Sequence, residues 1–269
     1  RAEIFVLSDS RKPAAVLEEM VAISRLRDIS PVPVWYRRRK NNKGRKAGNV
    51  ADFVTRWGGR YDQMVVLDAD SVMGAATIKA LSARMNADPA VGLIQTMPML
   101  VGGQTIFARL TQFAGRVYGP AIARGVAAWS GDSGNFWGHN AIIRTRAFAA
   151  CCGLPHLKGR KPFGGHIMSH DVVEAALMRR AGWAVHVTAS LDGSWEETPP
   201  SITDFIRRDH RWFQGNLQHL GLITAKGLSP MSRLQLLMGC MAYLSSPLWL
   251  ASLMVGLFIQ MFYPVDWTS

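Results

Sequence analysis

Two aspartates, Asp68 and Asp70, follow directly on an apolar run at residues 64–67. Side chains alternate along an extended chain, so the two carboxylates point to the same side. Like charges so close repel unless a cation lies between them, and a divalent ion with oxygen ligands meets that need. The pair is therefore a candidate magnesium site for a phosphate-bearing substrate. The same spacing also occurs in ordinary turns and in phosphatases whose first aspartate is a nucleophile, so the motif alone does not choose the chemistry.

Residues 37–46 hold seven lysines and arginines, and the run ends in Lys46-Ala47-Gly48-Asn49. Alone, such a run is most simply a solvated loop or a nucleic-acid patch. However, a lysine and a small-residue turn at the start of a helix, expected here over 50–57, also suit contact with a diphosphate.

Asp171 opens a helix expected over residues 171–181, with Glu174 in its first turn. Acidic residues there often only cap a helix. The chemical alternative is a general base, with Asp171 taking the proton of an acceptor hydroxyl. His170 and Glu174 have the spacing of a metal-binding pair, but the sequence offers no third ligand.

Arg208, Arg211 and Trp212 share one face of a helix expected over residues 201–222. Arginine beside an aromatic wall suits a phosphate. The same residue types also anchor an amphipathic helix at a membrane surface, and the two interpretations are compatible.

The elements that position these residues alternate along the chain. This alternation predicts an α/β fold, a mostly parallel mixed sheet with helices on both faces, whose ligands bind beyond the carboxyl ends of the strands. Asp9, Asp68 and Asp70 fall at such ends, and residues 130–140 (SGDSGNFWGHN) are expected to form a loop with close backbone approach. Strands are expected over 4–7, 32–36, 64–67, 92–95 and 183–187, and further helices over 13–26 and 75–85.

Residues 234–265 contain no charged side chain. A span of about 20 apolar residues crosses a bilayer, so this run predicts a membrane helix, in which Pro247 is tolerable. The alternative is an unusually long buried core helix. The chain begins directly on an expected strand without a signal peptide, which suggests an excerpt of a longer protein.

The 269 residues are 48% hydrophobic, enough for one large or two small domains. The net charge of +12 favours an anionic partner: nucleic acid, a nucleotide or an anionic membrane surface. The three cysteines, two of them adjacent, form neither a disulfide framework nor a zinc motif, and a reducing compartment fits them best.

Taken together, these stretches resemble the processive family 2 glycosyltransferases, such as bacterial cellulose synthase. IFVLSDSRKP, RYDQMVVLDADSVM and RRDHRWFQGNLQH are most similar to the glucosyltransferases of Gram-negative bacteria that make the backbone of osmoregulated periplasmic glucans. The resemblance covers nearly the whole chain. It implies an inverting enzyme with the GT-A fold, a UDP-sugar donor and a divalent metal, Mg²⁺ or Mn²⁺.

The resemblance also implies a role for each matching residue on the donor side. Asp9 would hold the uracil and Lys46 would contact the nucleotide. Asp70 would be the direct metal ligand, with Asp68 also binding the metal but nearer the nucleotide. Asp171 would be the general base.

On the acceptor side, the resemblance implies that Gly138, His139 and Asn140 border the acceptor site. Arg211 and Trp212 match the RW of the family's QxxRW motif, which serves the diphosphate, and Trp212 would also face the acceptor.

Two departures from the family pattern bear on acceptor geometry. Arg208, here grouped with the nucleotide-sugar ligands, stands where the family has glutamine. Ser169-His170 stands where the family usually has a glutamate before the base.

The implied organisation is a GT-A catalytic domain over 1–200, an amphipathic interfacial region over 201–230 and a transmembrane segment over 231–265. The implied activity is transfer of glucose from UDP-glucose to a growing β-glucan, with a β-1,2-linked backbone. Expected partners are the glucan acceptor chain and the lipid bilayer, with an acyl carrier protein and a periplasmic glucan-processing protein as further candidates. Nucleic acid is not expected. The expected location is the bacterial inner membrane, multi-pass, with the catalytic domain in the cytoplasm.

Two alternatives remain open from the sequence. One is another processive synthase of the same family, making cellulose, chitin or hyaluronan. The other is a basic module that binds nucleic acid or anionic membranes, which would have no need of Asp68, Asp70 or Asp171.

Overall fold

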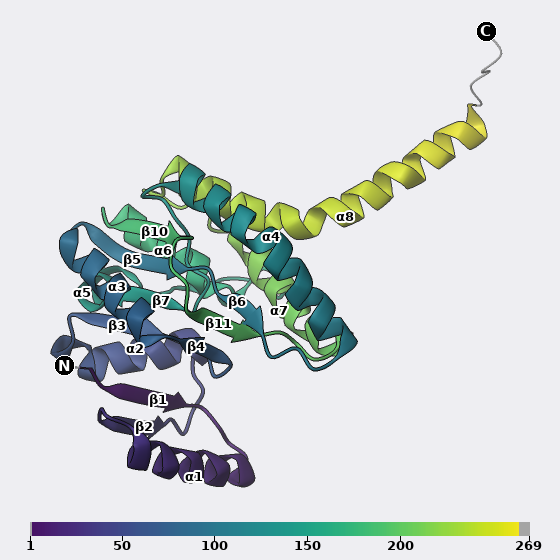
Figure 1. Ribbon diagram of the computed structural model, residues 1–269. Helices are drawn as coiled ribbons and strands as arrows, with labels where there is room; N and C mark the ends of the chain where they lie inside the picture. The colour runs from purple at the N-terminus through teal and green to yellow at the C-terminus, as the bar shows by residue number, and fades with distance from the viewer. Residues whose placement is uncertain (1, 264–269) are drawn as a thin grey trace.

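A mixed four-stranded sheet forms the centre of the protein, whose computed structural model describes residues 2–263 (Figure 1). The strand order is β10–β5–β7–β3. β10 runs parallel to β5, whereas β7 runs antiparallel to both of its neighbours. The strands are β3 (Gln63–Val66), β5 (Val91–Thr96), β7 (Ala141–Arg144) and β10 (Ala184–Thr188).

β3, β5 and β10 run in one direction and β7 is the one reversed strand of the four, so the sheet is mixed and mostly parallel in strand direction, as expected. The loop at residues 130–140 delivers the chain to the carboxyl end of β5, where the Thr96 amide donates to the Asn140 carbonyl at 3.1 Å. A strand that starts where its neighbour stops must run the other way. The same reversal pairs Ala141 with Val66, so the loop ends beside the aspartates that follow β3.

Helices cover both faces of this sheet, as expected. Leu93 and Ile94 are adjacent in β5 and nearly fully buried, yet they belong to opposite core clusters because successive side chains point to opposite faces. The first cluster includes Phe53, Phe148 and Met178, and the second includes Leu81 and Met85. These residues come from α2 (Arg45–Trp57), α5 (Thr145–Cys151), α6 (His170–Arg180) and α3 (Ala75–Ala87).

Three small sheets complete the body. The first pairs β1 (Ile4–Ser8) in parallel with β2 (Val34–Arg38), and α1 (Pro13–Ile29) connects them. In the second, β11 (Ser194–Glu197) lies between β4 (Ser71–Met73) and β6 (Met99–Val101). The third is a hairpin of β8 (His156–Leu157) and β9 (Gly165–His166). A short 3-10 turn, η1 (Gly58–Arg60), follows α2.

Every strand and helix expected from the sequence is present, with one boundary that matters for the site. α2 begins at Arg45 rather than near residue 50, after Gly44 in a left-handed conformation (φ 72°). Lys46 and Asn49 therefore lie in the first turns of a helix instead of in a turn before it. A fixed helical backbone gives the Lys46 side chain a defined direction.

The long helix α4 (Ile106–Ser130) was not predicted. Its sequence contains three glycines and Pro120, which are signals of turns and loops. Tertiary packing overrides them, and Thr105 caps the helix by accepting a hydrogen bond from the Ala108 amide at 3.1 Å.

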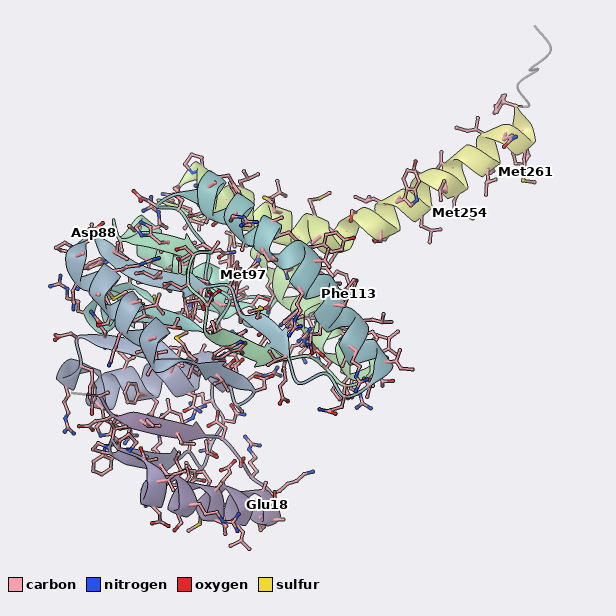
Figure 2. The ribbon with its side chains drawn as sticks, in the orientation of Figure 1. Glu18, Asp88, Met97, Phe113, Met254 and Met261 are labelled. Atoms are coloured by element: carbon pink, nitrogen blue, oxygen red, sulfur yellow. The ribbon has the colours of Figure 1, made fainter. Side chains whose placement is uncertain are left out.

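The last two helices are α7 (Ile202–His219) and α8 (Pro230–Phe262). The first turns of α8 pack on the body, where Leu236 and Cys240 are buried. Beyond them α8 leaves the body as a free rod, and the labelled Met254 and Met261 lie on this part (Figures 1 and 2). None of its most apolar stretch is buried, so the buried-core alternative is wrong and α8 is a candidate membrane span. The last two residues of the predicted segment, 264–265, lie outside the described residues.

Candidate active site

Lys46 and Asp68 form an ion pair at the carboxyl end of β3. Lys46 comes from the first turn of α2, and Asp68 lies two residues beyond Val66, where β3 ends. Both side chains are partly exposed, at 34% and 39%. The pair therefore opens to solvent and is accessible to an anionic ligand.

Gly138 joins this ion pair to the predicted base. A Cβ built on Gly138 would lie 3.3 Å from Asp171 Oδ2 and 3.5 Å from Lys46 Nζ. The backbone of Gly138 also has φ 88°, which side chains rarely adopt. The structure thus brings together Lys46, Asp68, Gly138 and Asp171, four residues from four different segments that the sequence analysis selected.

A buried pair, His170 and Glu174, lies next to Asp171 on α6. Their atoms Nδ1 and Oε2 are 3.2 Å apart, and Glu174 is 2% exposed. Burial raises the pKa of Glu174, and His170 opposes that shift. Burial lowers the pKa of His170, but the Glu174 carboxylate outweighs it and the pKa is raised overall. The two side chains face each other as an ion pair, and no third metal-ligating side chain clusters with them among residues 2–263.

Glu196 on β11 belongs to the site and was missed from the sequence. Its Oε2 lies 3.3 Å from His139 Nε2, and His139 Nδ1 lies 3.3 Å from Ser71 Oγ. Burial raises the pKa of Glu196, as do the charges of Asp70 and Asp68, whereas His139 and Arg208 lower it. The acidic pair Glu196-Glu197 at the end of a strand was the available signal, but β11 itself was not predicted.

Asn140 is fully buried, so it would serve the predicted acceptor site through its neighbours, and its place at that site stays a prediction. The amide Nδ2 donates to Ser194 Oγ at 2.8 Å and to the Trp195 carbonyl at 3.2 Å, while Oδ1 lies 2.9 Å from His139 Nδ1. Asn140 therefore fixes the loop and orients His139, whose ring is partly exposed.

Asp9, the predicted uracil ligand, is held by Arg39 in a two-point ion pair with distances of 2.7 and 2.6 Å. Arg39 also donates to the carbonyls of Lys43 and Arg45, which folds the basic run back onto the end of β1. Asp9 lies where the sequence placed it, at a strand end beside the basic run, and its role with a nucleobase stays a prediction.

Arg208 on α7 stacks on Trp212, with the guanidinium 4.5 Å from the ring centroid, and on Phe205 at 5.6 Å. Its charge acts on Glu196, so this side chain faces the acidic end of the site. Arg211 is exposed and Trp212 is 42% exposed. Of the three predicted residues on α7, Arg208 is the one whose charge lowers the pKa of a residue in the site, Glu196.

The carboxylates suit a divalent cation whose shell is completed by a substrate. Asp68 and Asp70 supply oxygen ligands, and their joint effect on Glu196 marks a region of negative potential. No third metal-ligating side chain joins them within the described residues. Magnesium commonly binds through one or two carboxylates plus substrate phosphates and water, which fits this donor set.

The sequence of the chain matches known proteins. A family model described as "Glycosyl transferase family group 2" matches residues 64–268. A protein named "Glucans biosynthesis glucosyltransferase H" from Shewanella baltica (strain OS155) is 58% identical over 259 residues, 96% of this chain and 36% of the relative. The protein of the same name from Shewanella oneidensis is 57% identical over the same shares. The chain thus spans about a third of the length of these relatives.

Among solved structures, residues 1–349 of TarS from S. aureus in complex with UDP-GlcNAc superpose with a TM-score of 0.49. The two chains are 10% identical, and the alignment covers 89% of this chain and 62% of that one. This likeness is too weak to support an inference about function.

Proposed function

Because the chain belongs to glycosyl transferase family group 2, we propose that it is the catalytic part of an inverting enzyme that transfers glucose from UDP-glucose to a growing β-glucan. The family predicted from the sequence is confirmed, and the sheet with helices on both faces agrees with the predicted α/β class. The proposal of glucose as the transferred sugar and of a glucan as the product follows from the names of the relatives. The β-1,2 linkage follows from the resemblance of the sequence to the glucosyltransferases of periplasmic glucan synthesis. The observation that carries the proposal is the contact of Gly138 with both Asp171 and Lys46.

On the donor side, Lys46 supports binding of the diphosphate, with Asp9 at the nucleobase. Family members generally use a divalent metal ion, which Asp70 and Asp68 would hold, and Mg²⁺ or Mn²⁺ would neutralise charge on the leaving UDP. Arg208, Arg211 and Trp212 line the α7 side of the same ligand. Fixed cationic groups aimed at developing negative charge stabilise a transition state without reorganising.

The proposed reaction is a single displacement. The acceptor hydroxyl oxygen attacks the anomeric carbon, Asp171 takes the hydroxyl proton, and the bond from that carbon to the UDP oxygen breaks. The glycine at 138 keeps the space between Asp171 and Lys46 open, so the nucleophile and the leaving group can meet there. His139 borders the acceptor side, held by Asn140 and Glu196.

The apolar surfaces support a place at a membrane. Ile106, Leu110, Phe113 and Val117 form an exposed stripe on one face of α4, with Phe113 labelled in Figure 2. α8 continues away from the body as an exposed apolar helix. Basic and aromatic residues on α7 suit the interface between these surfaces and water.

These features support the division into a catalytic domain (1–200), an interfacial region (201–230) and a membrane segment (231–265). The inner membrane, further membrane helices, a cytoplasmic catalytic domain and the two protein partners remain parts of the proposal.

The other chemistries fit the geometry less well. A phosphatase that used Asp68 as its nucleophile would have no need of Asp171, and the family that matches is one of glycosyl transferases. In the basic run, Arg37, Arg39 and Lys46 pair with Asp52, Asp9 and Asp68, so fewer charges face outward for nucleic acid.

A donor screen on the full-length protein in membranes tests the proposal. We expect UDP release with UDP-glucose and an acceptor glucan, dependent on a divalent cation. Asp171→Asn should keep UDP binding and lower transfer by about 10²–10⁴-fold, because a general base contributes about that much. Asp132→Asn is the matched control, since Asp132 is an exposed carboxylate paired with His186.

Absence of turnover with every UDP-sugar would contradict the proposal that the protein is a UDP-sugar-dependent transferase. Product analysis separates a glucan backbone from cellulose, chitin or hyaluronan. Unchanged transfer by Asp171→Asn would remove that residue as the base.

A further inference from the structure

A short segment, residues 164–169, contains β9 and the turn that leads directly into the start of α6, which carries Asp171. We refer to these residues as the base loop. Three of its backbone carbonyls and one amide hydrogen-bond to two adjacent side chains of α7, Gln218 and His219. The base loop is thus fastened to the helix that also carries Arg208, Arg211 and Trp212.

Gln218 makes three of these bonds and is fully buried. Its Nε2 donates to the carbonyls of Gly164 at 3.1 Å and His166 at 3.0 Å, and its Oε1 accepts from the Met168 amide at 2.8 Å. A primary carboxamide offers two N–H donors and an acceptor on one planar group, which matches this set. An ionised carboxylate could only accept.

His219 supplies the fourth bond and is also fully buried. Its Nε2 lies 3.1 Å from the Ser169 carbonyl, and a carbonyl only accepts, so Nε2 carries the hydrogen. Burial lowers the pKa of His219, which favours this neutral form.

α7 and the base loop are also in close contact at Gly215. A Cβ built on Gly215 would lie 2.2 Å from Ser169 Oγ and 2.6 Å from the Ser169 amide nitrogen. Ser169 itself makes no capping hydrogen bond with its side chain at the start of α6. The direction of that first turn, and so of Asp171, therefore depends on contacts with α7.

From these contacts we propose that Gln218 is a positioning residue for the transfer reaction. Through the base loop it holds Asp171 at the distance from the acceptor hydroxyl that proton transfer needs, and His219 assists. α7 thus positions the base, Asp171, and also carries the side chains proposed to surround the leaving diphosphate. The inference rests on the proposed function, because it takes Asp171 to be the base.

Gln218→Met tests it in the full-length protein, since methionine keeps the volume and loses all three hydrogen bonds. We expect kcat to fall by about tenfold to a hundredfold, because small misplacements of a reacting group are that costly. The KM for UDP-glucose should stay within about twofold, as the donor site is untouched. Gln112→Met on α4 is the matched control: Gln112 accepts a hydrogen bond from the Gly103 amide, and its variant should keep kcat.

A double-mutant cycle separates positioning from general damage to the fold. In the Asp171→Asn background, Gln218→Met should cause no further loss of the slow residual transfer, since there is no base left to position. Equal losses in both backgrounds would show a merely structural role and overturn the inference.

The two proposals fail in different ways. Wild-type transfer by Asp171→Asn overturns the base, whereas an inactive Asp171→Asn with wild-type kcat in Gln218→Met overturns only the positioning role. If Gln218→Met does not fold, Gln218→Glu replaces it: it retains the acceptor for Met168 and lacks the two donors, so the same fall in kcat is expected. Wild-type kcat in that variant contradicts the inference.

Discussion

Single residues set the spacing between the base and the donor pair. Gly138 occupies a backbone conformation that disfavours side chains, and a Cβ there would lie 3.3 Å from Asp171 Oδ2 and 3.5 Å from Lys46 Nζ. Around this point Lys46 pairs with Asp68 and Arg39 with Asp9, and His139 Nε2 lies 3.3 Å from Glu196 Oε2. A ligand entering the site must therefore compete with or join ion pairs that already exist.

Gly138→Ala should separate strain from function. The substitution at positive φ should cost about 1–2 kcal/mol of unfolding free energy. Turnover should fall at least about tenfold, because the new methyl group lies against the base and the lysine. Thermal unfolding and UDP release measure the two effects.

The control is Gly131→Ala, which also has positive φ (50°) but meets nothing within 4 Å. A similar loss of stability with unchanged turnover is expected there. If both variants lose activity equally, backbone strain and not the space at Gly138 decides the effect.

Among the elements, α7 combines the most tasks. Its middle carries Arg208 and Trp212, and its C-terminal part carries Gly215, Gln218 and His219, which contact the base loop. α8 packs against α7, and the Tyr243 hydroxyl of α8 donates a hydrogen bond to Asp209 of α7 at 3.0 Å. A change on either helix is thus transmitted to the site through packed contacts.

Gly215→Ala should loosen the contact between α7 and the base loop. The added methyl group meets the Ser169 backbone, so overpacking should cost about 1–3 kcal/mol, partly offset by the better helix propensity of alanine. We expect lower stability together with a lower kcat.

Gly119→Ala on α4 is the matched control, since no atom lies within 4 Å of its Cβ position. That variant should be neutral or more stable by up to about 1 kcal/mol. The test is to measure the unfolding free energy and kcat of both variants. A Gly215→Ala enzyme with wild-type stability and kcat would contradict the proposed role of this close contact.

At the scale of the whole molecule, charge and apolar surface are separated. The ion pairs lie on the body around the central sheet, while α8 and one face of α4 expose large apolar side chains. Large exposed apolar surfaces of this kind mark interaction sites. A bilayer beside α4 and around α8 would cover both.

Leu253→Arg should weaken association of the chain with lipid vesicles. Leu253 lies on the exposed part of α8, and a charge near the bilayer centre costs about 2.5–3.5 kcal/mol, roughly a hundredfold or more in partition. Flotation with vesicles measures the change. Leu17→Arg on α1 is the control, because Leu17 is also apolar and exposed but lies on another helix. Equal loss in both variants would mean that α8 has no special role in membrane binding.

The sequence by itself determined most of the elements that carry the candidate site and most of the charged residues expected in it. Apolar runs ending in acids marked β1 and β3, and these local patterns were enough to place Asp9 and Asp68 at strand ends. Helical spacing marked α6 and α7, and length with absence of charge marked α8. These signals are local, because they depend on periodicity and on the residue types within one segment.

Only the tertiary structure decided how those segments meet. The glycines and Pro120 masked α4, since packing outweighs local propensity there. Asn140 is fully buried. Glu196 lies in the site on β11, a strand that the sequence did not predict. Gln218 hydrogen-bonds to the base loop. Burial and hydrogen bonds between residues some 50 positions apart depend on the packing of whole elements, which no local pattern encodes.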